Sequence, residues 1–133
     1  TAALKTLEVM QKVKSWELIT EIGLKVRAGW EKLAETNNLK IIISGIPAMS
    51  SYSFDCDNNL ALHTYVTQEM LKKGFLAADK FYACTEHNND IIEQYLHALS
   101  KVFKKINEIQ QSKKNIIDLL EGPIRHSGFK KIN

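Results

Sequence analysis

Glu86, His87 and Asp90 form the densest group of titratable side chains in this chain of 133 residues. A carboxylate beside an imidazole could transfer protons during a reaction or bind a metal ion. Adjacent residues of an extended segment point to opposite faces, however, and an acid at position 90 favours the start of a helix. We therefore assign Asp90 to helix initiation and expect no catalytic centre in this group.

Other residues that could do chemistry are few. The chain lacks the GxxxxGKS/T, GxGxxG, GxSxG and HExxH motifs, and it has only six glycines that could approach a phosphate. His63 and His97 fall on predicted helices, where we expect half-exposed surface histidines without a catalytic role. Cys56 and Cys84 form no CxxC motif, so neither a disulfide framework nor a zinc site is predicted. The polar and aromatic tail over residues 125–129 could bind an anion or dock on another surface, and we expect docking.

The charge pattern excludes several classes of partner. The 18 basic and 15 acidic residues leave a formal charge of +3, and the charges are scattered singly, so no nucleic-acid binding is expected. No apolar run has the roughly 18 residues of a membrane span, and no export signal precedes the first helix, which predicts a cytoplasmic protein without a membrane partner. The apolar content of 44% suffices for one compact domain. A start at Thr1, directly before a helical pattern, suggests a segment of a longer protein.

Hydrophobic periodicity predicts helices and strands that follow one another along the chain. The expected order begins with a helix ending near Lys14, a helix capped by Ser15 and ending at Asn37 and Asn38, and strands over 39–44 and 48–55. A helix ending at 72–74 and a strand over 75–84 follow. The last long helix is capped by Asn88 or Asn89, carries Ile92 and Tyr95 on its apolar face and runs to 106, and a short helix over 116–120 comes after it. Gly45 and Pro47 are expected to end the first strand. This order predicts an α+β fold, a two-layer sandwich in which a small, mainly antiparallel three-stranded sheet is covered by helices.

Several segments, in this order and spacing, carry a family resemblance. Residues 2–10 (AALKTLEVM) look like the helix that leads class III pyridoxal-phosphate (PLP) aminotransferases from their large domain into the small one. Residues 22–34 resemble the next helix of that family. The resemblance lies in the segments IGL at 22–24, GW at 29–30 and LA at 33–34. Residues 67–77 (TQEMLKKGFLA) and the tail, with LEGP at 120–123 and HSGFK at 126–130, are similar to the glutamate-1-semialdehyde aminomutase branch.

The chain thus resembles the C-terminal small domain of a class III PLP-dependent aminotransferase. The resemblance implies a connecting helix at 1–14, the small domain at 15–106, and a C-terminal helix and tail at 107–133. In this family the cofactor lysine, the acid at the pyridine nitrogen and the phosphate donors lie in the large domain. The resemblance therefore implies no catalytic or cofactor-binding residue here, and an inactive fragment that does not bind PLP. We reject Lys80 as the Schiff-base lysine because its surroundings do not resemble the family's lysine segment.

The resemblance also implies that the small domain closes over the active site and excludes water from it. Our candidates for the wall of the substrate cleft are Phe81, Tyr82, Thr85 and His87. The hydroxyl groups of Tyr82 and Thr85 could contact substrate, or these residues could simply end a strand. One departure from the family is Glu86-His87-Asn88, which stands where Ala-His-Thr is common.

The implied partners are the chain's own large domain, a second copy in a full-length homodimer, and a small amino-group donor and acceptor. The substrate stays open among an amino acid, a semialdehyde and a sugar, as does the choice between transfer and an internal shift of the amino group. A different interpretation is a free-standing α+β interaction or regulatory module. A third is an aminotransferase-like domain whose catalysis has decayed, motivated by Glu86.

Overall fold

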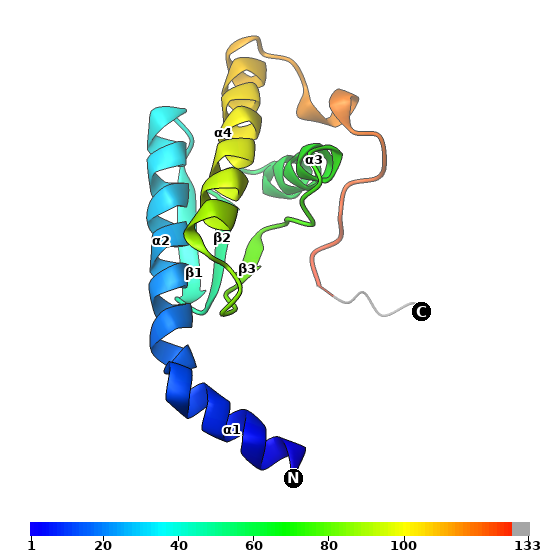
Figure 1. The fold of residues 1–133 in the computed structure, drawn as a ribbon. Coiled ribbons are helices and arrows are strands. Elements are labelled where there is room, and N and C mark those ends of the chain that lie inside the picture. Colours follow the sequence, from blue (N-terminus) through cyan, green and yellow to red (C-terminus); the bar gives the residue numbers. More distant parts are fainter. Residues whose placement is uncertain (129–133) are drawn as a thin grey trace, which may run out of the picture.

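A computed structural model describes residues 1–128 of the chain, and Figure 1 shows its arrangement. Its elements are α1 (Ala2–Val13), α2 (Ser15–Thr36), β1 (Ile41–Ile46), β2 (Met49–Phe54), α3 (Asn59–Lys72), β3 (Lys80–Tyr82), α4 (Asn89–Gln111) and the 3-10 helix η1 (Ile116–Leu119). The strands form one antiparallel sheet in the order β1-β2-β3. The predicted α+β fold with a three-stranded antiparallel sheet and covering helices is confirmed.

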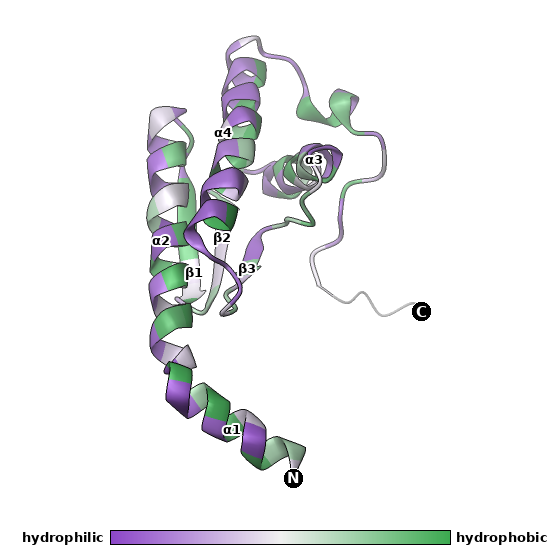
Figure 2. Cartoon of the chain, viewed as in Figure 1, coloured by the Kyte–Doolittle hydropathy of each residue, from purple (hydrophilic) through white to green (hydrophobic). Residues whose placement is uncertain are grey.

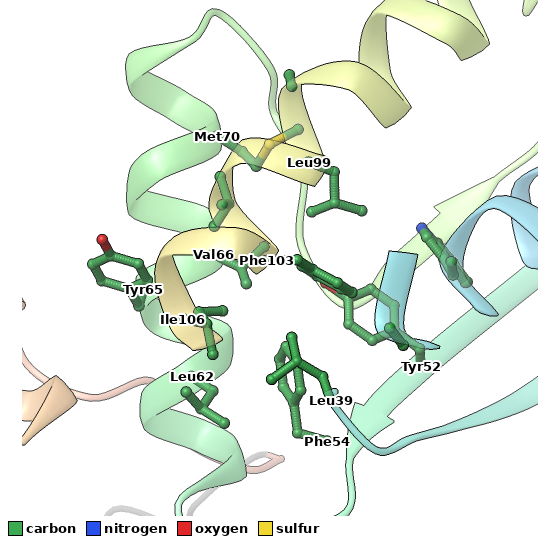
Figure 3. Close-up of a cluster of buried hydrophobic side chains, with 14 of the residues drawn as sticks. Leu39, Tyr52, Phe54, Leu62, Tyr65, Val66, Met70, Leu99, Phe103 and Ile106 are labelled. Carbon is green, nitrogen blue, oxygen red and sulfur yellow. The ribbon is translucent and has the colours of Figure 1, made fainter. Parts of the chain in front are cut away.

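One face of the sheet carries the core, because side chains of β2 alternate between two environments. Tyr52 is buried and meets an aromatic ring from each of the three long helices: Trp30 of α2 at a centroid distance of 4.8 Å, His63 of α3 at 5.0 Å and Phe103 of α4 at 6.0 Å. Figure 3 shows Tyr52, Phe103 and Phe54 within this cluster. The helices α2, α3 and α4 therefore all cover the same face.

The opposite face of the sheet has no helix on it among the described elements, and we call it the open face. The register pairs Ile46 with Met49 and Met49 with Tyr82, so these three side chains form one row across the strands. Each of them, and Ile42 as well, is more than half exposed. Large apolar side chains are thus presented to solvent on a flat surface.

The helix α2 is held against the hairpin between β1 and β2 by backbone contact. A β-carbon on Gly23 would overlap the carbonyl oxygen of Pro47 in the hairpin turn, so only glycine permits this approach. Arg27 then donates from Nε to the buried Ser50 hydroxyl at 2.7 Å and from Nη2 to the Gly45 carbonyl. These contacts fix α2 relative to the sheet and, through it, the helices that share the core.

The residues 112–125, which we call the C-terminal strap, cross α3 and dock on it (Figure 1). Ile116 is buried, and the Gln68 side chain of α3 donates to the Leu119 carbonyl at 3.1 Å and accepts from the Glu121 N–H at 2.8 Å. At its far end, Arg125 forms an ion pair with Asp79 at 2.8 Å. Docking of the tail is therefore confirmed for Arg125, whereas Phe129 and Lys130 lie outside the described residues.

The structure corrects the predicted role of His63. This residue was expected on the surface, but it is only 2% exposed, and neither ring nitrogen has a hydrogen-bond partner within residues 1–128. Its ring packs on Tyr52 and Phe54 at 5.0 Å from each, so it acts as an aromatic core residue. Burial lowers the pKa of His63 to about 4, because the charged form would lose its hydration.

Several predicted boundaries also move. Ser15 does not cap α2, because Lys14 in a left-handed conformation (φ 49°) precedes the helix and the Ser15 side chain is buried. Gly45 lies within β1, which spans Ile41–Ile46 and not 39–44. The third strand is only Lys80–Tyr82, and α4 runs past residue 106 to Gln111, since Ile109 keeps its apolar stripe buried. Within residues 1–128, no helix is both long and apolar enough to cross a membrane.

Candidate functional site

A cavity opens between β3, the segment that precedes it and the first turns of α4, and we call it the aromatic pocket. It has a volume of about 290 Å³. Three chain segments come together here because β3 pairs with β2 at the sheet edge and α4 packs on the core face of the sheet, where Phe103 meets Tyr52. The lining consists of Phe75, Leu76, Ala77, Lys80, Phe81, Tyr82, His87, Ile91, Ile92 and Tyr95.

Stacked rings form much of the pocket. Phe81 lies between His87, at a centroid distance of 4.9 Å, and Tyr95, at 6.2 Å with an interplanar angle of 27°. Phe75 meets Tyr95 edge-on at 6.2 Å. Such offset and edge-to-face contacts match the preferred geometries of aromatic pairs. The pocket is therefore built on a set of rings that hold one another in place.

Tyr95 anchors these rings to the core. Its hydroxyl oxygen accepts a hydrogen bond from Trp30 Nε1 at 2.9 Å, which joins α4 to α2 in a buried site. Burial raises the pKa of Tyr95 to about 12, partly offset by that hydrogen bond. The phenol therefore stays protonated at neutral pH and serves a structural role.

His87 is held by the turn that leads into α4. Its Nδ1 accepts from the Cys84 N–H at 3.1 Å, so a neutral imidazole carries its proton on Nε2 and can donate from there. The next residue, Asn88, caps α4 by accepting from the Ile91 N–H at 2.9 Å, which confirms the predicted cap. The ring of His87 is thus oriented by the same turn that starts the helix.

The structure brings together three of the four residues that we predicted for the cleft wall. Phe81, Tyr82 and His87 line the aromatic pocket, whereas Thr85 is exposed and does not line it. Tyr82 is 58% exposed and also belongs to the row on the open face. Glu86 is exposed outside the lining, and among residues 1–128 no group of three or more acidic, His or Cys side chains is arranged to hold a metal ion.

Sequence reasoning did not assign the other half of the pocket. Tyr95 and Ile92 were predicted to be on the apolar face of the last long helix, and Phe75 was predicted to start a strand. The structure places all three in the lining as well. A usable signal was the presence of aromatic residues at positions 75, 81 and 95 on both sides of His87 in the sequence.

Comparison with known proteins finds similarity to a solved structure. No family model and no curated protein matches the chain. Among solved structures, the chain is similar to the PLP internal aldimine form of the FumI protein from Sphingopyxis sp. MTA144, with a TM-score of 0.72 and 21% sequence identity. The match covers 84% of this chain and 27% of that one, so the chain spans about a quarter of the FumI protein's length. At this identity the likeness shows a shared fold.

The residues of the aromatic pocket do not fit a complete PLP site. An enzyme of that kind supplies a lysine for the cofactor and a group that tunes the pyridine nitrogen. The lining contains one lysine, Lys80, but no carboxylate that could pair with a pyridine nitrogen. We therefore derive no step on a cofactor within this chain. What the pocket can do is enclose an apolar or aromatic group, with Lys80 and the His87 imidazole as its polar contacts.

Proposed function

We propose that this chain is the C-terminal small domain of a cytoplasmic, PLP-dependent class III aminotransferase or aminomutase, of the glutamate-1-semialdehyde aminomutase-like branch. Its active site would be supplied mainly by a large domain that precedes residue 1. The observation that carries the proposal is the shared fold with a segment of the FumI protein, whose structure contains PLP as an internal aldimine. The family resemblance of residues 2–10 and 67–77 supports the same assignment.

The helix α1 supports the presence of a further domain. None of its residues is buried, and Figure 2 shows hydrophobic positions recurring along it. Leu4, Leu7 and Met10 are 61%, 60% and 42% exposed, and their spacing of three residues makes each the neighbour of the next along the helix surface. An apolar stripe of this length is costly in water, and contact with a large domain would cover it. We propose residues 1–14 as the connecting helix.

The open face of the sheet supports the same arrangement from a second direction. Its row of Ile46, Met49 and Tyr82 is flat, apolar and free of covering elements within residues 1–128. A sheet normally buries at least one face, and here the second face is also apolar along this row. A large domain that contacts both α1 and the open face would enclose β3 at the boundary.

In this role the domain would act as a wall and lid. PLP, held by the large domain, supplies the electron sink for amino-group chemistry. This chain's residues Phe81, Tyr82 and His87 would line the cleft, exclude water from it and orient a bound substrate. Thr85 is on the exposed side of the same turn and would reach substrate only from the rim. The parent would be a homodimer that uses a small amino-group donor and acceptor.

The test compares the chain alone with the chain restored to its upstream coding sequence. Alone, it should bind no PLP as an internal aldimine, which absorbance spectroscopy detects. Joined to the upstream region, it should bind PLP and transfer an amino group. An aldimine band from the 133-residue chain alone would show that we have misplaced the cofactor lysine, and Lys80→Gln would then identify the residue. An upstream region that encodes no PLP-enzyme domain would refute the proposal.

A second candidate is a free-standing α+β module that binds a partner through its apolar surfaces. The exposed stripe of α1 favours it, because a partner protein could cover that stripe as well as a large domain could. The reading frame upstream of residue 1 separates the two, since a stop codon there supports the module. A decayed enzyme, suggested by Glu86, would bind PLP after restoration but would transfer no amino group, and Glu86→Ala would test the cause.

A further inference from the structure

The aromatic pocket has features of a ligand site beyond those of a core defect. Four rings, from Phe75, Phe81, His87 and Tyr95, lie around a cavity of about 290 Å³, close to the lower end of roughly 300–1,000 Å³ for small-molecule sites. The rings contact one another at centroid distances of 4.9 to 6.2 Å, so their positions do not depend on a ligand. A preformed set of ring faces and edges favours a ligand that carries a ring of its own.

The charges around the aromatic pocket favour an anion. Its lining holds Lys80 and the His87 imidazole but no acidic side chain. Asp79, the residue next to Lys80, is already engaged by Arg125 at 2.8 Å, and Lys80 forms no ion pair within residues 1–128. Glu86 and Asp90, the next acids along the chain, lie outside the lining. Lys80 pairs with Ser51 on the same side of the sheet as Tyr82, and it lines the pocket from that side. A lysine there without a free carboxylate in the lining favours a negative charge in the ligand.

The rim also exposes apolar surface that a ligand would cover. Leu76 is 97% exposed beside the opening, and Ile91 is 42% exposed on the first turns of α4. A leucine that is almost fully hydrated gains from any apolar group placed against it. A sugar fits this lining less well, because its hydroxyl groups would face rings and aliphatic carbons with few polar side chains to satisfy them.

We propose that the aromatic pocket binds a small molecule that combines an aromatic ring with an anionic group. The ring lies among Phe75, Phe81 and Tyr95, and the anion lies near Lys80 at the rim. That this molecule is the amino-group donor or acceptor of a parent enzyme rests on the proposed function. Among the substrate classes left open by the sequence, this selects an aromatic amino acid or a related aromatic oxo acid.

The test is a titration of the 133-residue chain, followed by amide shifts in two-dimensional NMR spectra. The probes are 3-phenylpropionate, 3-phenylpropanamide, which lacks the charge, and hexanoate, which lacks the ring. 3-Phenylpropionate should bind at least roughly threefold more tightly than each of the others, with its largest shifts at residues 75–77, 80–82 and 87–95. Equal affinity for hexanoate would overturn the aromatic preference, and equal affinity for the amide would overturn the anionic one. Shifts centred elsewhere would overturn the site.

Two variants locate the charge contact. Lys80→Gln, at an exposed position, should weaken 3-phenylpropionate severalfold and leave the amide unchanged. Lys101→Gln removes an exposed lysine of α4 outside the pocket and should change neither affinity. If both variants weaken 3-phenylpropionate equally, the contact is a general charge effect and the proposal fails. In each case, an unchanged spectrum of the free variant verifies the fold.

This experiment contains no PLP, so its outcome is independent of the proposed function. If the chain binds 3-phenylpropionate as described but the restored parent transfers no amino group, the binding site is supported and the enzyme assignment is refuted. If the restored parent transfers amino groups but the chain does not discriminate among the probes, the enzyme assignment is supported and the proposed substrate class is refuted.

Discussion

The two ends of the chain are attached to the same core in different ways. The C-terminal strap buries Ile116, accepts one hydrogen bond from the Gln68 side chain of α3 and donates another to it, and closes with the ion pair between Arg125 and Asp79. The helix α1 is regular and amphipathic, yet none of its residues is buried, and among the described elements it packs mainly on α2. Both ends carry apolar residues, but only the strap uses them within this chain. Secondary structure alone therefore does not define membership of the folded unit, whereas burial does.

The largest expected difference concerns one apolar side chain from each end. Ile116→Ala should lower the free energy of unfolding by about 2–4 kcal/mol, because it leaves a cavity under the strap. Leu7→Ala should change it by less than about 0.5 kcal/mol, since the side chain is already exposed. Urea denaturation of the two variants measures both values. Similar losses in the two variants would erase the distinction between the ends.

Acid should loosen the side of the core that carries the strap. Burial lowers the pKa of His63 to about 4, whereas an unfolded histidine titrates near 6.5. Between these values the unfolded state binds a proton that the folded state excludes, so stability falls as the pH decreases from about 6.5 to 4. The contribution should be about 2–3 kcal/mol, and it should be absent in His63→Phe. His97→Phe provides a matched control, because it replaces the same residue type at an exposed position. Denaturant titrations of both variants and the wild type across this pH range make the comparison.

A smaller effect is expected from one ion pair at each end. The side chains of Asp79 and Arg125 are 20% and 34% exposed, whereas those of Glu8 and Lys5 in α1 are 65% and 76% exposed. Asp79→Asn should cost about 1–2 kcal/mol, and Glu8→Gln less than about 0.5 kcal/mol. A double-mutant cycle with Arg125→Met should give a coupling energy of the same size for the strap pair alone.

The Asp79 pair also has a defined pH range. Burial acts to raise the pKa of Asp79, but the hydrogen bond and charge of Arg125 outweigh it and hold the pKa below its ordinary value. A lowered carboxyl pKa contributes stability that is complete above the unfolded pKa of about 3.9 and is lost as the pH falls through the folded one. The strap should therefore keep this contact at pH 5, where His63 already reduces stability. A loss of the coupling energy at pH 5 would contradict this order.

The smallest change in stability is expected when α1 is removed altogether. Deletion of residues 1–13 should alter the free energy of unfolding by less than about 0.5 kcal/mol, because no side chain of α1 is buried. If the exposed apolar side chains of α1 cause the chain to self-associate, the deletion should reduce that association in sedimentation velocity. A loss of more than about 1 kcal/mol would mean that α1 belongs to the folded unit after all.

The sequence predicted those parts of the fold that depend on local chemistry. Asn88 was predicted as a cap because its side chain can accept a hydrogen bond from a first-turn N–H, and it does so at 2.9 Å. The break between the first two helices was also predicted, but its cause was assigned to the wrong residue. Ser15 is a common capping residue, whereas the left-handed Lys14 that makes the turn has no recognisable propensity for it.

What the sequence could not predict depends on contacts between distant segments. Histidine on a helix is usually a surface residue. His63 is buried because its ring packs against Tyr52 and Phe54, which come from a distant segment of the chain. Phe81, Tyr82 and His87, which were predicted for a cleft wall because they lie close together in sequence, also line the aromatic pocket. Tyr95 was missed since a helix face that packs on a core and one that lines a cavity have the same periodicity.

The contact of Gly23 with Pro47 has a mechanical consequence for any force that reaches α1. No room exists there for even a methyl group, and together with the Arg27 hydrogen bonds this contact opposes sliding of α2, roughly 33 Å long, along the hairpin. The joint between α1 and α2 is Lys14, the one left-handed residue that separates the two helices, and we expect bending to occur there. We therefore expect α1 to rotate about Lys14 when it is displaced. Any force transmitted beyond Lys14 would move α2 and the hairpin together as one rigid body. Because β3 pairs with β2 of that hairpin, such a movement would also shift the edge strand that lines the aromatic pocket.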